Sequence, residues 1–323
     1  MAKKESQKTM FEHSEVKVKL LETYLKRYFN ILNNAQFVGD IHYFDLFSAE
    51  GIYENGGKGS PIIVLESIKN AYYAAKYKKG QSGKFHCLFN DLDENKITTL
   101  QKNISNLKLH NSELGEIDFS QKDYKFLVPE VSKRINELKK GEKAFVFIDP
   151  YGYKEVRISD IRSLLQKGNS EVLLFLPTHF MFRFVEGGTP ESLYEFIEEI
   201  VPKKEWPKSV TGLDFIENLK NGFKNYLGEK IFVDTFVISR DKNQFFCLFF
   251  FTSHIYGFDR MLDAKWELDE EQGRGWAFNS NIVDLFSALE KEPNTQKFEN
   301  ELKVFIKGNN RNNKEVYEFT LKN

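Results

Sequence analysis

Short apolar runs alternate with helical patterns along the first 180 residues, and this alternation constrains the fold more than any other feature of the sequence. Apolar, β-prone runs lie at 41–47, 85–91, 143–152 and 170–179, with a weaker one at 117–124. Residues with helical spacing lie before and between them, at 13–32, 60–77, 94–107, 128–140 and 160–166. Strands that alternate with helices form parallel sheets, and nearly continuous apolar strands are typical of a sheet covered on both faces.

The pattern changes after residue 230. Two β-prone runs within 231–254 are joined by Arg-Asp-Lys-Asn, which predicts an antiparallel hairpin. The class I methyltransferases have this plan: five parallel strands are followed by a hairpin, and the last strand of the hairpin lies antiparallel to its neighbours. We therefore predict an α/β, Rossmann-like sheet, mostly parallel with the last strand antiparallel. The expected organisation is an N-terminal helix (1–35), a methyltransferase-like domain (36–290) with a helical insertion at about 180–228 over the carboxyl edge of the sheet, and a short C-terminal extension (291–323).

Composition limits the compartment and the partners. Hydrophobic residues make up 41% of the chain, with 31 Phe, which is enough to build a buried core. The net charge of −1 provides no long-range field for nucleic acid or membranes, and it leaves local basic patches open. No apolar run reaches the ~18 residues of a membrane span. Cys87 and Cys247 lie in apolar runs, which predicts buried thiols, and no Cys/His spacing indicates a metal. We expect a cytoplasmic protein without a metal.

The stretch YFDLFSAEGIY (43–53) ends the first predicted strand and opens a loop. Ligands of doubly wound sheets bind at the carboxyl ends of the strands. A phosphate-binding P-loop fails here, because Gly57 stands where its lysine is required. A dinucleotide fingerprint also fails, because Ile62 replaces its third glycine. S-adenosyl-L-methionine carries no phosphate and requires less: a turn of small residues near its methionine moiety and an acidic residue after the second strand for its ribose.

Acidic residues follow three successive predicted strands, as this cofactor requires. After the second strand, Asp91 is the first choice for the ribose hydroxyls and Asp93 the second, although Asp93 could instead cap the next helix. After the third strand, Asp123 would bind the adenine amine, unless it is an exposed turn residue. In the first loop and the helix that follows it, the predicted cofactor-binding residues are Asp45, Ser48, Ala49, Gly51 and Ser60.

The fourth strand ends in Asp-Pro-Tyr-Gly (149–152). This resembles the [DN]-P-P-[YF] signature of amine methyltransferases, and more closely the Asp-Pro-Phe-Gly of tRNA guanine exocyclic-amine methyltransferases. The Asp149 carboxylate or the Pro150 carbonyl can accept the N–H groups of an exocyclic amine and orient its lone pair. Tyr151 or Tyr153 can stack on an extruded base. Pro150 fixes the turn and Gly152 permits it, which also fits an ordinary strand-ending turn.

Five further residues are candidates for contacting the substrate. His13 lies near the start of the first predicted helix, where it either points into the site or is a partly buried helix-start residue. His179 and His254 end two strands and are expected near the rim of the sheet. Arg274 and Trp276 are predicted in an exposed loop, where they would contact a base or a phosphate or else anchor the loop.

Together these motifs resemble the three-Cys-motif partner (TcmP) family along most of the chain. The shared elements are an N-terminal H-[ST]-x-x-K helix, a first loop of the form F-[AS]-G-x-G-x-Y followed by G-S-P, Asp-Pro-aromatic-Gly, and a Ser/Thr-rich strand end before a methionine-bearing helix. In this chain they correspond to His13, Ser14 and Lys17, to Phe47–Tyr53 with Gly59–Pro61, to Asp149–Gly152, and to 251–262. Members tend to continue into a small winged-helix-like tail. Ala49 departs from the pattern, because the family usually has glycine there, and a positive φ would cost alanine about 1 kcal/mol or more.

The resemblance implies a class I methyltransferase-like fold and a partner with three cysteines, similar to radical-S-adenosylmethionine proteins, in nucleic-acid modification or prokaryotic defence. Two functions remain open. The first is a methyltransferase acting on an exocyclic amine of a nucleic-acid base. The second is a non-catalytic subunit that binds S-adenosylmethionine or the partner, which the alanine at position 49 and the near-neutral net charge favour.

Overall fold

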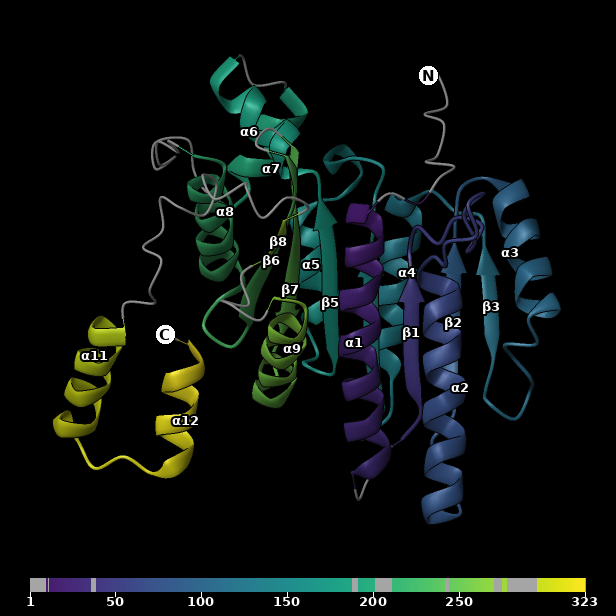
Figure 1. Cartoon of the computed structure of the whole chain (residues 1–323), viewed down its shortest axis with the longest axis horizontal. Coiled ribbons are helices and arrows are strands. Elements are labelled where there is room, and N and C mark those ends of the chain that lie inside the picture. Colours follow the sequence, from purple (N-terminus) through teal and green to yellow (C-terminus); the bar gives the residue numbers. More distant parts are fainter. Residues whose placement is uncertain are drawn as a thin grey trace.

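A single mixed sheet forms the centre of the molecule (Figure 1). The computed structural model describes residues 10, 12–35, 39–187, 191–200, 211–241, 244–269, 275–277 and 295–322. The strands follow the order β3-β2-β1-β4-β5-β7-β6-β8. Their bounds are β1 Ile41–Asp45, β2 Phe85–Asn90, β3 Ile117–Ser120, β4 Lys143–Ile148, β5 Ser170–Leu176, β6 Phe232–Asp241, β7 Gln244–Thr252 and β8 Gly275–Ala277.

The pairing of the strands confirms the predicted topology. The strands β1 to β5 pair in parallel, so their carboxyl ends lie along one edge. The hairpin of β6 and β7 places β7 antiparallel between β5 and β6. A further short strand, β8, pairs in parallel with β6 and was not predicted. An α/β sheet with one antiparallel strand set among parallel ones is therefore present.

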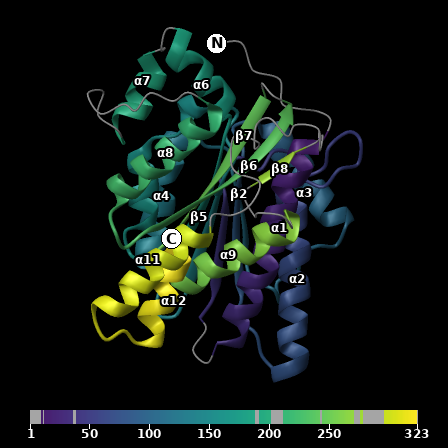
Figure 2. The same cartoon turned by 60° about the vertical axis from the view of Figure 1, so that its left-hand side comes forward.

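Helices cover both faces of the sheet (Figures 1 and 2). One face carries α1, α2, α3 and α9, and the other carries α4, α5 and α8. Alternate residues of β4 show this division, since Phe145 and Phe147 face the first group and Val146 and Ile148 face the second. The bounds of these helices are α1 Glu12–Asn34, α2 Ser60–Lys79, α3 Glu94–Asn106, α4 Tyr124–Glu137, α5 Ile158–Leu165, α8 Gly212–Leu227 and α9 Ile255–Leu268.

The segment predicted as a helical insertion divides between two places. The helices α6 (Thr178–Gly187) and α7 (Glu191–Glu198) lie beyond the carboxyl edge of the sheet (Figure 1). In contrast, α8 packs on the sheet itself, where the ring of Phe223 lies 5.3 Å from that of Phe249 and 4.9 Å from that of Phe251. Only α6 and α7 are therefore placed to cover the carboxyl edge within the described part of this segment.

The C-terminal residues form two helices, α11 (Thr295–Gly308) and α12 (Asn313–Lys322), which lie near α9 (Figure 2). The rings of Tyr256 on α9 and Tyr317 on α12 are 6.5 Å apart. Where the sequence indicated a helix barely begun, α12 spans 10 residues. None of the described helices is both long and apolar enough to cross a bilayer.

Two serines lie at the starts of α1 and α2 without capping these helices. The helix α1 begins at Glu12, so Ser14 lies inside it and does not cap it. The cap of α2 is Gly59, so Ser60 is the first helical residue and its hydroxyl is free for another partner. Both cysteines, Cys87 and Cys247, are buried free thiols, as predicted.

Candidate functional site at the carboxyl edge

The loop after β1 forms a compact backbone cradle. Its residues Ala49 and Gly51 have positive φ angles of 50° and 77°. The amide of Ser48 donates to the carbonyl of Asn90 at 2.7 Å, and the amide of Gly59 donates to the carbonyl of Gly51 at 2.7 Å. At Gly51 a Cβ atom would lie 2.6 Å from Leu100 Cδ1. Position 49 has the positive φ whose cost the sequence analysis considered, and alanine adopts this conformation at that cost.

A pocket of about 50 Å³ lies in this cradle. Its walls come from the first loop, from α1, from the start of α2 and from the end of β4. Of the predicted site residues, the pocket brings together Ser48, Ala49, Gly51, Ser60 and Asp149. Residues that are 100 positions apart in the sequence therefore meet where doubly wound sheets bind their ligands.

Asp45 ends β1 directly below this pocket and is fully buried. Its Oδ2 accepts a hydrogen bond from the Ser60 hydroxyl at 2.7 Å, and its Oδ1 accepts one from the Phe47 amide at 3.3 Å. Burial raises the pKa of Asp45 to about 7, although the Ser60 hydrogen bond opposes this rise. Asp45 thus connects the first loop to the start of α2. It does not line the pocket itself, but its partner Ser60 does.

Asp91 follows β2 and is already engaged by groups of this chain. Its carboxylate is 3% exposed. Oδ1 accepts the Asp93 amide at 2.9 Å, and Oδ2 accepts the Tyr151 hydroxyl at 3.0 Å. The ammonium of Lys96 lies 3.6 Å from Oδ2 and also contacts the Tyr151 hydroxyl. Burial, followed by the negative charge of Asp91, raises the pKa of Tyr151, so the phenol stays protonated and donates.

The other two predicted acids act as helix caps. Asp93 is the N-cap of α3, and its Oδ1 accepts the Asn95 amide at 3.0 Å. Asp123 is the N-cap of α4, and its Oδ1 accepts the Lys125 amide at 3.0 Å. The capping alternative for Asp93 was the better interpretation, and Asp123 has the same local role.

Asp149 ends the fourth strand and faces α1. Its Oδ2 contacts the ammonium of Lys17, a lysine that is only 6% exposed. The same ammonium lies 4.5 Å from the centre of the Phe175 ring. Burial opposes the charge of Lys17 most strongly, but the negative charge of Asp149 and smaller contributions from Tyr53 and Asp45 together raise its pKa. The ion pair Lys17–Asp149 is therefore present at the wall of the pocket.

The turn after Asp149 presents one aromatic ring rather than two. Tyr151 is 40% exposed, and the Lys96 ammonium lies 4.6 Å from the centre of its ring. Tyr153 is buried in a 3₁₀ turn, where its ring lies 6.4 Å from that of Phe196, so it is not available to stack on a base. Gly152 has φ −174°, an extended backbone that any residue adopts, so the turn does not require glycine at this position.

The remaining substrate-contact predictions fall away from the pocket or outside the described residues. His179 belongs to the first turn of α6 instead of β5, and its Nδ1 lies 2.9 Å from the carbonyl oxygen of Phe245. Trp276 is in β8 at the far edge of the sheet, where it is partly buried against the core, so the exposed-loop prediction was wrong. Arg274 and the side chain of His13 lie outside the described residues.

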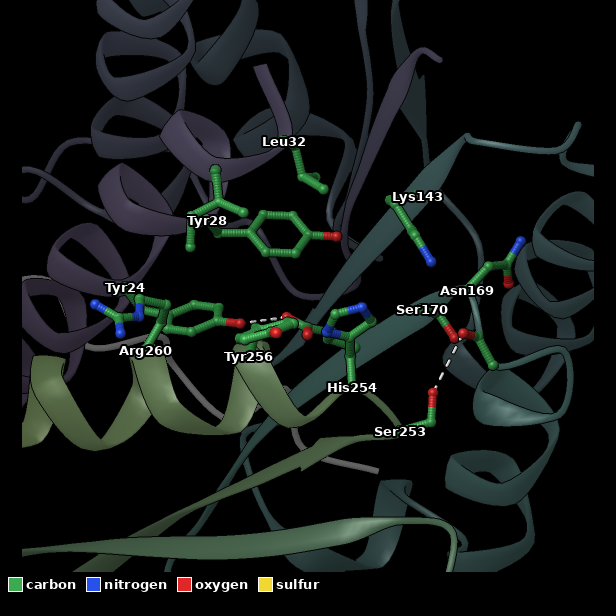
Figure 3. A pocket seen from close by; sticks show the side chains of 14 residues that line it. Tyr24, Tyr28, Leu32, Lys143, Asn169, Ser170, Ser253, His254, Tyr256 and Arg260 are labelled. Atoms are coloured by element: carbon green, nitrogen blue, oxygen red, sulfur yellow. Dashed lines mark hydrogen bonds between the residues drawn. The ribbon is translucent and has the colours of Figure 1, made fainter. Parts of the chain in front are cut away.

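His254 lies at the opposite edge of the sheet, because the antiparallel β7 ends where β4 and β5 begin. It lines a second, mainly apolar pocket of about 90 Å³ with Tyr24, Tyr28 and Lys143 (Figure 3). The polar centre of that pocket is Glu171, which accepts hydrogen bonds from Tyr24 and from Thr252. None of the residues predicted to bind a cofactor lies in this second pocket.

Three functional residues were not singled out from the sequence. Lys17 and Lys96 supply the cations that pair with the site carboxylates. Asn90 fastens the neighbouring loops, since its Nδ2 donates to the carbonyls of Leu46 at 3.1 Å and Lys122 at 3.0 Å. The available signal for Lys17 was its place in the H-[ST]-x-x-K pattern. Lys96 and Asn90 carry no pattern of their own.

The strand order and the single antiparallel strand between β5 and β6 define a Rossmann-like, class I methyltransferase fold. No protein-family model matches the sequence, and no curated protein matches it. Among solved structures, a protein from Legionella pneumophila aligns with 73% of this chain and 85% of its own at 11% identity and a TM-score of 0.38. Loganic acid methyltransferase with SAH aligns with 94% of this chain and 93% of its own at 12% identity and a TM-score of 0.31. Both TM-scores are below 0.5, so the assignment of the fold rests on the strand order.

Proposed function

We propose that this chain is an S-adenosylmethionine-dependent methyltransferase that acts on an exocyclic amine of a nucleic-acid base. The observation that carries the proposal is the meeting of three features at one edge of the sheet. They are the left-handed loop at Ala49 and Gly51, the carboxylate of Asp91, and the Asp149–Tyr151 turn. A strand-end arrangement of this kind offers separate contacts to the two ends of a nucleoside-based donor.

The residues at this edge match the chemistry of S-adenosylmethionine. When bound, this donor supplies an electrophilic methyl group on a positively charged sulfur. The left-handed backbone of Gly51 lets the loop pack closely on Leu100 while it lines the pocket, and the carboxylate of Asp91 is suited to accept the two ribose hydroxyls. Because the Tyr151 hydroxyl now bonds Asp91, it has to leave before the ribose can bind. Tyr151 is on an exposed turn, which gives its side chain room to rotate.

The acceptor end of the site fits a weakly nucleophilic amine. An exocyclic amine shares its lone pair with the base, so it needs its N–H groups held and its lone pair aimed at the methyl carbon. The Asp149 carboxylate and the Pro150 carbonyl are the acceptors at the end of β4, and the exposed face of Tyr151 can stack on the base. Alignment and the exclusion of water supply the rate, and Asp149 accepts the proton that the amine releases.

The partner is proposed from the motifs alone. The pattern of the three-Cys-motif partner family predicts that the chain acts with a protein carrying three cysteines, similar to radical-S-adenosylmethionine proteins. Such pairs of proteins resemble systems for nucleic-acid modification or prokaryotic defence. Co-purification of the native protein, with identification of bound protein and nucleic acid, tests this part.

The experiment for the reaction uses donor with a labelled methyl group and two substrate pools, tRNA and DNA, with and without the partner. We expect label in one pool, and loss of the label with Asp149→Ala while donor binding by calorimetry persists. A matched control is Asp118→Ala, because Asp118 is an exposed acid on β3 that pairs with Arg134 away from the pocket. Absence of any donor binding would contradict the proposal.

A non-catalytic subunit is the second candidate, and one observation favours it. Both carboxylates assigned to ligands are paired with lysines of this chain, Asp91 with Lys96 and Asp149 with Lys17. A protein that binds the donor as a signal, or binds only the partner, could keep these pairs permanently. Donor binding with no transfer to any pool, in the presence of the partner, would decide for this candidate.

A further inference from the structure

Lys17 is a buried cation that the fold alone does not require. Its side chain is 7% exposed and comes from α1, a helix that otherwise presents apolar residues such as Leu20 and Leu21 to the sheet. Burying an ammonium costs several kcal/mol unless the charge is paired. A methionine or leucine would pack against Phe175 without that cost. The charge at position 17 therefore calls for a function at the site.

The groups around Lys17 come from every side of the donor pocket. Asp149 from the end of β4 contacts its ammonium, and Phe175 from β5 lies beneath it. Two further ionisable groups act on it: Asp45 at the end of β1, and Tyr53 of the first loop, whose pKa is raised by burial so that its hydroxyl is neutral. Of these, Tyr53 and Asp149 line the pocket, and so does Val18, the residue after Lys17. Lys17 is thus joined to the wall of the pocket through Asp149 and through its neighbour Val18.

The donor carries a free amino-acid end at the same place. Its methionine moiety has a carboxylate, which requires a cation or several N–H donors when it leaves water. The residues that line this pocket are acidic or neutral, and the lysine paired with the lining residue Asp149 is Lys17. An ammonium has three N–H groups, so it can bond a ligand carboxylate and still hold Asp149.

We propose that Lys17 binds the α-carboxylate of the donor while it holds Asp149 in place. This rests on the proposed function and goes beyond it by naming the subsite for the amino-acid end of the donor. One lysine then links the two halves of the reaction, because it contacts the donor on one side and the carboxylate that orients the acceptor on the other.

The test compares two ligands that differ only in this carboxylate. Calorimetry measures binding of S-adenosyl-L-methionine and of its decarboxylated form to the wild-type protein and to Lys17→Met. We expect the wild-type protein to prefer the complete donor by at least tenfold, since charge-assisted hydrogen bonds are the strong ones. The Lys17→Met protein should lose that preference, and Lys17→Arg should keep most of it.

The control is Lys96→Met, which removes the other site lysine at the ribose end. It should change the affinities for both ligands by the same factor and leave their ratio intact. Equal affinity of the wild-type protein for the two ligands overturns the subsite and leaves the proposed function standing. Binding of neither ligand overturns both. If Lys17→Met does not fold, as judged by circular dichroism, the ratio in the wild-type protein still decides.

Discussion

Replacing Ala49 with glycine tests whether the loop after β1 is held in a strained conformation. Its φ of 50° lies in the left-handed region, which costs an L-residue about 1–2 kcal/mol relative to a relaxed backbone. Glycine removes that cost. It also makes the unfolded chain more flexible, which lowers the free energy of unfolding by about 0.4–1 kcal/mol. The expected net gain in the free energy of unfolding is about 0.5–1 kcal/mol. For a chain of 323 residues this corresponds to a rise in Tm of about 0.7–1.5 °C.

The matched control is Lys108→Gly. Among the described residues, Lys108 is the other non-glycine residue with positive φ, at 51°, and it is exposed at the end of α3. Both substitutions should raise Tm in thermal denaturation followed by circular dichroism. Only Ala49→Gly should also change the affinity for the donor, because position 49 lines the pocket. A lower Tm for Ala49→Gly together with a higher one for Lys108→Gly would refute the assignment of strain to the loop.

Three further outcomes follow from the same contacts. Tyr151→Phe keeps the ring but removes the hydroxyl that occupies Asp91, so calorimetry should show about three- to tenfold tighter donor binding; weaker binding would mean that the hydroxyl contacts the donor. Gly51→Ala combines a φ of 77° with a Cβ 2.6 Å from Leu100 Cδ1, so unfolding by urea should show a loss of about 1–3 kcal/mol. Burial raises the pKa of Glu171 to about 7, so its protonated form is favoured in the folded state, and the stabilisation is lost as pH rises from about 4 to about 7. Glu171→Gln should flatten that part of the curve of Tm against pH, and an unchanged curve would contradict the assignment.

Local patterns predicted the parts of the molecule that local physics determines. The apolar runs gave the strands β1 to β7, because a strand covered on both faces has to be apolar along its whole length. The acids at strand ends also followed from local rules, and Asp93 shows how two rules compete at one residue. An aspartate directly before a helix is both a possible cap and a candidate ligand, and in the structure Asp93 caps α3.

The predictions that failed depend on strand direction, strand pairing or helix packing, none of which a local sequence pattern shows. His254 was expected near the rim of the sheet, and because β7 runs antiparallel it lies at the edge opposite the candidate site. Trp276 was read as a loop residue because three residues are too few for a strand pattern, and β8 exists through its pairing with β6. Tyr153 could not be separated from Tyr151 by sequence, since the difference comes from α7 packing over one ring.

The two lysines of the site, Lys17 and Lys96, compensate the charges of its two carboxylates. Asp91 and Asp149 follow β2 and β4, the two parallel strands on either side of β1, and each would leave an uncompensated negative charge at a partly buried edge. Each pairs with a lysine from a helix on the same face, Lys96 from α3 and Lys17 from α1. These contacts bring together residues 132 positions apart in one case, so no spacing rule reveals them. The ribose hydroxyls of the proposed donor would have to displace the Tyr151 hydroxyl from Asp91, whereas its carboxylate would gain from Lys17. The site therefore distinguishes the two ends of the donor by charge, and this is the property that the comparison of the complete and the decarboxylated donor measures.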